Sequence, residues 1–140
     1  MLDRILIATD GSRKAEAAVE HGLDLAATFD AEVHALYVVE TKGSYVRSVG
    51  ASEAGLEEYR QYGHGVVDEV VDRAEERGLE AVGAVESGAV AGAIVDYADA
   101  ASIDAVVVAE RGRGTLETYL GSNVEKVLRR CPQPVTVVRS

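Results

Sequence analysis

The chain has 140 residues, 47% of them hydrophobic, and carries a formal net charge of −10. This length and apolar content are typical of one domain, which we expect to span residues 1–140. The acidity argues against DNA or RNA as a partner, because nucleic acid is itself a polyanion, and no apolar run approaches the roughly 20 residues of a membrane helix.

Short apolar runs alternate with amphipathic stretches along the chain. In chain order the sequence predicts a strand over 4–10, a helix over 13–29, a strand over 31–40, a loop over 41–55, a helix over 56–78, a strand over 79–87, a helix over 89–102, a strand over 104–110, a helix over about 123–130 and a strand over 133–140. The first helix rests on the helical spacing of Ala17, Ala18, His21, Leu25 and Phe29. This alternation predicts a single-domain α/β fold, a five-stranded parallel sheet with helices on both faces.

The ends of three predicted strands carry the residue types of a binding site. In parallel α/β sheets, ligands bind beyond the carboxyl ends of the strands, where the strand order reverses. The first strand ends in Thr9, Asp10 and Gly11, the second contains Val38 near its end, and the fourth ends near Ala109. If the first and fourth strands are neighbours, these residues meet in one crevice. Asp10 could hold a ribose hydroxyl or a phosphate-bound metal, or it could simply be a turn residue.

A glycine-rich, locally basic segment follows the fourth strand. Residues 111–140 hold six of the fourteen basic side chains and only two of the twenty-four acidic ones. Gly112 and Gly114 would let the backbone approach an anion closely, and Gly121 and Ser122 precede a helix whose first N–H groups can bind phosphate. The alternative is purely structural, since Ser122-Asn123-Val124-Glu125 also fits a capping box. The two interpretations are compatible.

Three segments together resemble the universal stress protein family over essentially the whole chain. They are RILIATDGS at the start, VHALYVVE on the second strand, and GRG…LGSNVEKVLRRCPQPVTVV near the end. The resemblance implies a Rossmann-like fold of the adenine nucleotide alpha hydrolase-like type, usually dimeric. It also implies, for part of the family, ATP binding through G-x-x-G, nine residues and then G-[ST].

The resemblance assigns expected roles to individual residues. Asp10 matches an acid near ribose and phosphate, and the backbone of Val38 matches a contact with adenine. Gly112 matches the second motif glycine, and Gly121 and Ser122 match the closing pair. Ala109 stands where the motif has its first glycine, and eight residues instead of nine separate Gly112 from Gly121. The candidate binding residues are Thr9, Asp10, Gly11, Val38, Ala109, Gly112, Gly114, Gly121, Ser122 and Asn123.

The sequence therefore predicts a universal stress protein that binds or senses ATP or AMP, with Mg²⁺ accompanying ATP, in a stress response. The alternative is the same fold with a degenerate cleft that acts as a protein-interaction module. The region of the loop offers no general base, nucleophile or metal cluster, so we expect at most weak ATP hydrolysis. We further expect a homodimer through the fifth strand, at Val135 and Val137, because an uncovered apolar edge favours pairing.

Two features of composition indicate where the protein works. Cys131 is the only cysteine, which excludes an internal disulfide and favours a reducing, cytoplasmic location. The start of the chain lacks the features of a signal peptide. Only three of the basic residues are lysines, and many carboxylates with few lysines would suit a protein of a salt-loving organism.

Overall fold

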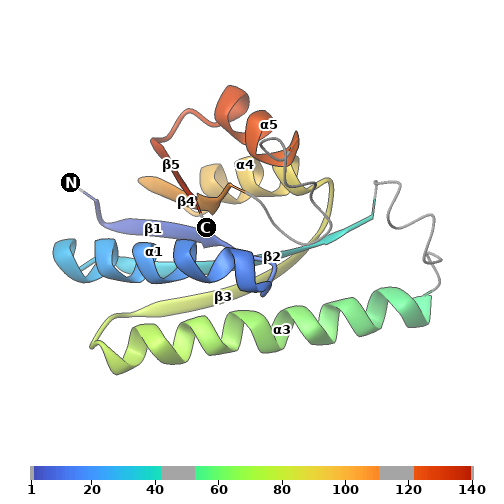
Figure 1. Cartoon of the computed structure of the whole chain (residues 1–140), viewed down its shortest axis with the longest axis horizontal. Helices are drawn as coiled ribbons and strands as arrows, with labels where there is room; N and C mark the ends of the chain where they lie inside the picture. The colour runs from blue at the N-terminus through green and yellow to red at the C-terminus, as the bar shows by residue number, and fades with distance from the viewer. Residues whose placement is uncertain (1, 42–52, 111–121, 140) are drawn as a thin grey trace.

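The computed structural model describes residues 2–41, 53–110 and 122–139. Figure 1 shows one sheet flanked by helices. The elements are β1 (Arg4–Ala8), the 3₁₀ helix η1 (Arg13–Ala15), α1 (Glu16–Phe29), β2 (Glu32–Glu40), α3 (Glu53–Glu76), β3 (Ala81–Gly88), α4 (Val90–Ala100), β4 (Ala105–Ala109), α5 (Ser122–Arg130) and β5 (Val135–Val138). The predicted five-stranded parallel α/β fold is confirmed.

The strand order is β3-β2-β1-β4-β5, with β1 at the centre. Ile5 of β1 lies beside Val33 of β2 on one side and beside Ala105 of β4 on the other. The chain builds outward from β1 to β2 and β3, and then crosses back to add β4 and β5 on the opposite side. The order therefore reverses between β1 and β4, as the sequence interpretation required.

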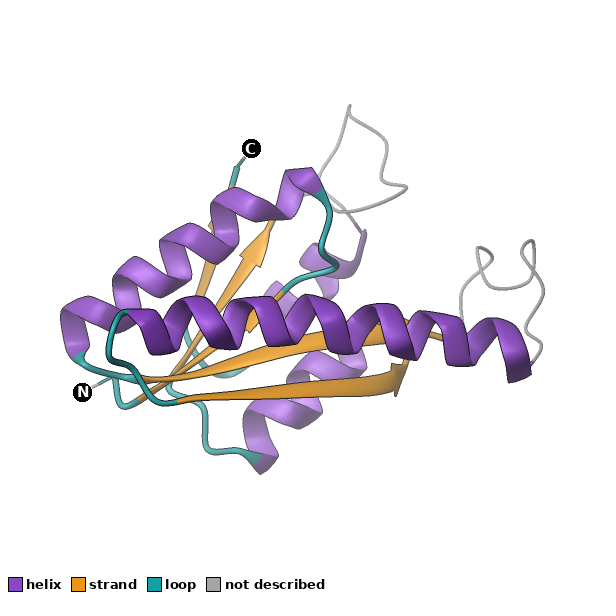
Figure 2. Ribbon diagram, turned by 90° about the horizontal axis from the view of Figure 1, so that it is seen from below, coloured by secondary structure: helices purple, strands orange, loops and turns teal. Residues whose placement is uncertain are grey.

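Helices cover both faces of the sheet. α1 and α3 lie on one face, and α4 and α5 lie on the other (Figure 2). Side chains of a strand alternate between the faces, so Ile5 and Ile7 pack against α1 and α3, whereas Leu6 packs against α4 and α5. The central strands are buried on both sides, which explains their unbroken apolar sequences. No helix in the described parts of the chain is long and apolar enough to span a membrane.

Several predicted boundaries differ from the structure. β1 ends at Ala8 rather than at residue 10, so the next residues form a turn, and α3 starts at Glu53, inside the predicted loop. Of the residues whose spacing predicts α1, only Ala18 is buried. The other buried residues of this helix include Val19 and Leu23, while Phe29 is 44% exposed. Small apolar residues surround most of this helix, so their spacing predicts a helix without selecting the face that packs.

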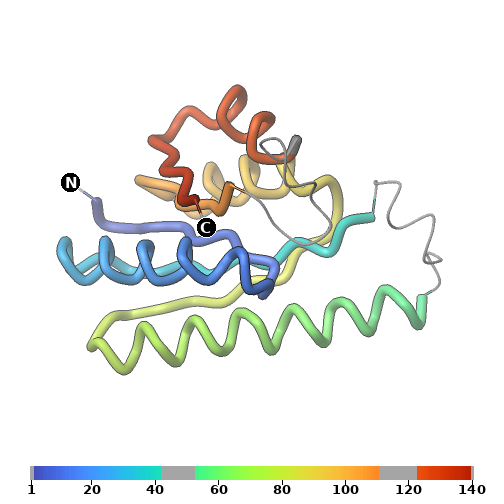
Figure 3. The backbone as a smooth tube through the Cα atoms, viewed as in Figure 1, coloured from blue at the N-terminus to red at the C-terminus, as the bar shows by residue number. Residues whose placement is uncertain are grey.

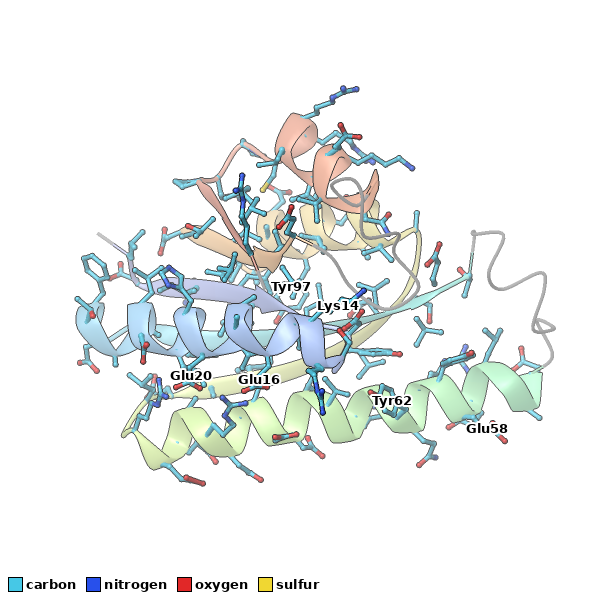
Figure 4. The ribbon with its side chains drawn as sticks, in the orientation of Figure 1. Lys14, Glu16, Glu20, Glu58, Tyr62 and Tyr97 are labelled. Carbon is cyan, nitrogen blue, oxygen red and sulfur yellow. The ribbon has the colours of Figure 1, made fainter. Side chains whose placement is uncertain are left out.

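A row of ion pairs joins α1 to α3. Glu16, Glu20 and Asp24 are spaced four residues apart and therefore share one face of α1. Arg73 of α3 contacts Glu16 at 2.7 Å and also contacts Glu20, and Arg77 contacts Glu20 at 2.5 Å and Asp24 at 3.0 Å. Figure 4 shows Glu16 and Glu20 between the two helices. The hydrogen bond from Arg77 is the main reason why the pKa of Glu20 is lowered from its ordinary value.

Candidate functional site

The candidate site lies at the carboxyl ends of β1, β2 and β4. Ala8 pairs with Leu36 of β2, and the ladder continues when the Thr9 N–H donates to the Leu36 carbonyl at 3.0 Å. On the other side of β1, Ile7 pairs with Val107, two residues before the end of β4. The structure thus brings the carboxyl ends of the first, second and fourth strands to the same end of the sheet, at the point where the strand order reverses.

The turn after β1 is held by its own side chains. The Thr9 hydroxyl oxygen accepts a hydrogen bond from the Gly11 N–H at 3.1 Å, and Asp10 Oδ1 accepts one from the Ser12 N–H at 2.9 Å. Thr9 is 9% exposed, and Asp10 is half-buried. The Ser12 Oγ atom is buried and has no hydrogen-bond partner in the described structure, although a buried hydroxyl normally has one.

Two features of the structure require a glycine at position 11. Its φ angle is +77°, in the left-handed region that L-residues rarely adopt. A Cβ atom at this position would also lie 2.6 Å from Val66 Cγ2 and 2.8 Å from Tyr62 Oη, both on α3. Helix α3 therefore packs directly on the turn that carries Asp10. Figure 3 shows the chain passing from β1 into α1 beside the middle of α3.

The other strand ends contribute mainly backbone and small side chains. Val38 is half-buried and packs on the α4 and α5 side of the sheet. Ala109 is the last residue of β4, and its φ is not positive, so an alanine at the position of the first motif glycine introduces no backbone strain. Glu110 follows, and its carboxylate lies 4.0 Å from the Arg139 guanidinium. This pairing offsets part of a negative charge near the proposed phosphate site.

The remaining predicted residues are only partly described. Gly112, Gly114 and Gly121 lie outside the described residues. Ser122 begins α5, although its side chain is outside the described structure, and Asn123 is half-buried in the first turn of that helix. Arg13 and Lys14 of η1 add positive charge directly after the β1 turn. Figure 4 shows Lys14 at this place.

A second polar cluster involves His34 of β2 and Tyr97 of α4. His34 of β2 is 7% exposed, with Nδ1 2.7 Å from the Tyr97 hydroxyl and Nε2 2.5 Å from Glu32 Oε1. Both ring nitrogens therefore lie within hydrogen-bond distance of a partner. Burial, followed by the charges of Glu86 and Glu32, raises the pKa of Tyr97, so its hydroxyl remains a donor at neutral pH. His34 is therefore a satisfied buried histidine. Within the described ranges, no group of three histidine, cysteine or acidic side chains could hold a metal ion.

The family of the chain follows from sequence comparison. The model of the universal stress protein family matches residues 1–139. The chain belongs to this family. A universal stress protein of Methanocaldococcus jannaschii is 33% identical over 138 residues, which is 97% of this chain and 81% of that protein.

Solved structures of universal stress proteins have the same fold. UspA from Lactobacillus plantarum superposes with a TM-score of 0.86 at 22% identity, over 99% of this chain and 98% of that one. A universal stress protein in complex with cAMP has a TM-score of 0.72 at 24% identity, over 99% and 97% of the two chains. The Archaeoglobus fulgidus universal stress protein in complex with dAMP has a TM-score of 0.74 at 16% identity, over 99% and 98%.

Two residues of the candidate site were missed by sequence reasoning. Ser12 was visible as part of the Asp-Gly-Ser turn, but nothing in the sequence shows that its hydroxyl is buried without a partner. Tyr62 lies fifty residues after the turn that it contacts, on a helix predicted only from its apolar spacing. Only the packing of α3 on the sheet brings the two segments together.

Proposed function

We propose that this universal stress protein binds an adenine nucleotide, ATP or AMP, in the crevice between the ends of β1 and β4. The proposal depends on one observation: the strand order reverses between β1 and β4. Asp10, Val38 and Ala109 lie at the carboxyl ends of neighbouring strands at this point. Crevices of this kind are the usual ligand sites of parallel α/β folds.

Further observations support an anionic ligand. The segment from residue 111 to the end of the chain carries a net positive charge, whereas the whole chain is strongly acidic. The buried, unpartnered Ser12 hydroxyl at this end of the sheet could bond an incoming polar group. Two family members of the same fold have been solved in complex with cAMP and with dAMP. In our proposal, Asp10 lies near ribose and phosphate, and any Mg²⁺ enters with the phosphates of ATP.

We propose sensing rather than fast catalysis as the biological role. A bound nucleotide would report the energy state of the cell during stress, and the protein would act in the cytoplasm. The alternative, a module that interacts with proteins and has lost nucleotide binding, is favoured by one observation: the spacer between Gly112 and Gly121 has eight residues instead of nine.

Isothermal titration calorimetry with ATP and AMP separates these functions. We expect binding to the wild type and no binding to Gly121→Val, because a β-branched residue before α5 would block the approach of phosphate. Gly65→Val is the matched control, since a Cβ at Gly65 meets nothing within 4 Å. Gly121→Val that binds as tightly as the wild type would locate the site elsewhere. A wild type that binds no adenine nucleotide would favour the interaction module.

We also propose that the protein is a homodimer joined through β5. This strand is at one edge of the sheet, and its four residues, Val135–Val138, are all half-buried in the single chain. An isologous pair of β5 strands would cover both edges and close the assembly.

A further inference from the structure

We propose that Tyr62 of α3 is a positioning residue for the nucleotide site, which it serves by holding the turn that presents Asp10. This inference rests on the proposed adenine-nucleotide function and adds to it a residue from outside the crevice strands. Tyr62 is 40% exposed, so filling the core does not by itself explain a large side chain at this position.

The first step is the contact between α3 and the turn. The Tyr62 hydroxyl oxygen would lie only 2.8 Å from a Cβ at Gly11, and its ring carbon Cζ would lie 3.4 Å away. Val66 lies four residues later, on the same side of the helix, and its Cγ2 would lie 2.6 Å away. Together the two side chains pack closely against Gly11.

The second step is the support of Tyr62 itself. Its ring meets the ring of Tyr37 edge to face, with centroids 5.7 Å apart and an angle of 70° between the ring planes. Tyr37 is 5% exposed in β2, and it lies so close to Gly63 that a Cβ there would clash with its ring. Tyr62 is therefore packed against a buried residue of the sheet.

The third step connects this contact to Asp10. A glycine at φ +77° has many conformations open to it in the unfolded chain, so the turn needs contacts that select one of them. Within the turn, the Gly11 and Ser12 N–H groups bond to the side chains of Thr9 and Asp10. From α3, Tyr62 and Val66 pack against Gly11 and limit the movement of the turn. Removing Tyr62 should therefore loosen the Asp10 carboxylate while leaving the sheet intact.

The experiment compares Tyr62→Ala and Tyr62→Phe with the wild type. Phe29→Ala is the matched control, because Phe29 is an aromatic residue of similar exposure, 44%, at the far end of α1. Hydrogen exchange of the Gly11 and Ser12 amides is measured without nucleotide, and the dissociation constant for ATP or AMP is measured by calorimetry.

We expect Tyr62→Ala to speed exchange at both amides and to weaken nucleotide binding about tenfold, the lower end of what supporting residues of a binding site contribute. Tyr62→Phe should restore at least part of both losses, and Phe29→Ala should leave both unchanged. The proposal is overturned if Tyr62→Ala exchanges or binds like the wild type, or if Phe29→Ala shows the same losses. If the wild type binds no nucleotide, the proposed function fails, and faster exchange in Tyr62→Ala would still show that this residue holds the turn.

Discussion

Gly11→Ala tests the contact between α3 and the Asp10 turn, and Gly78→Ala provides its control. The φ angles of the two glycines are +77° and +78°, so an added methyl group carries the same backbone penalty at both positions. At Gly78, however, a Cβ would meet nothing within 4 Å, whereas at Gly11 it would lie 2.6 Å from Val66 and 2.8 Å from Tyr62. The difference between the two variants therefore isolates the contact with α3.

The expected loss of stability can be worked out for each variant. An L-residue in the left-handed region lowers the free energy of unfolding by about 1–2 kcal/mol. Alanine also makes the unfolded chain stiffer than glycine does, which raises the free energy of unfolding by about 0.4–1 kcal/mol. Gly78→Ala should thus lower the free energy of unfolding by about 1 kcal/mol. Gly11→Ala adds an overpacking cost of about 1–3 kcal/mol, which gives a total loss of about 3 kcal/mol.

The assay is chemical denaturation of both variants and the wild type, with the denaturant slope compared to verify that the unfolded states match. The excess loss in Gly11→Ala, about 2 kcal/mol, should appear as a lower denaturant midpoint. In a parallel thermal melt it should lower the melting temperature by about 8 °C, at roughly 4 °C per kcal/mol. The excess loss should shrink when Val66→Ala removes the nearest methyl group. Equal losses at Gly11 and Gly78 would refute the claim that α3 presses on this turn.

Three further predictions concern charge and assembly. Arg77→Ala should destabilise the fold by about 1 kcal/mol, because it removes two partly exposed ion pairs, and the pKa of Glu20 should rise toward 4.5 in an NMR titration. Since the folded pKa of Glu20 is lowered, its contribution to stability is present above pH 4.5 and disappears as the pH falls, so wild type and variant should converge in acid. Molar chloride should raise the melting temperature, because it screens the repulsion of a chain with net charge −10; a flat or falling trend would contradict this. Val137→Lys should convert a dimer into a monomer in light scattering, and a variant that stays dimeric would remove β5 as the interface.

The sequence by itself determined the fold class. The strands around Ile5 and Val107 are short and apolar throughout, as strands buried on two faces must be, and the stretches between them have helical spacing. These are local properties of the chain, so a single sequence reveals them. The candidate site residues also followed from local signals, because Asp10 lies in the turn after β1 and Ala109 is the last residue of β4.

Only the tertiary structure decided which of these local pieces touch. The order of β1 beside β4, the face of α1 that packs on the sheet, and the contact of Tyr62 with Gly11 all join residues far apart in the chain. Such contacts depend on how helices pack on the sheet, and many helix rotations satisfy the same apolar spacing. The choice among them is made by the shapes of specific side chains: at Gly11 and Gly63, the absence of a Cβ allows α3 to pack closely on the turn and on β2.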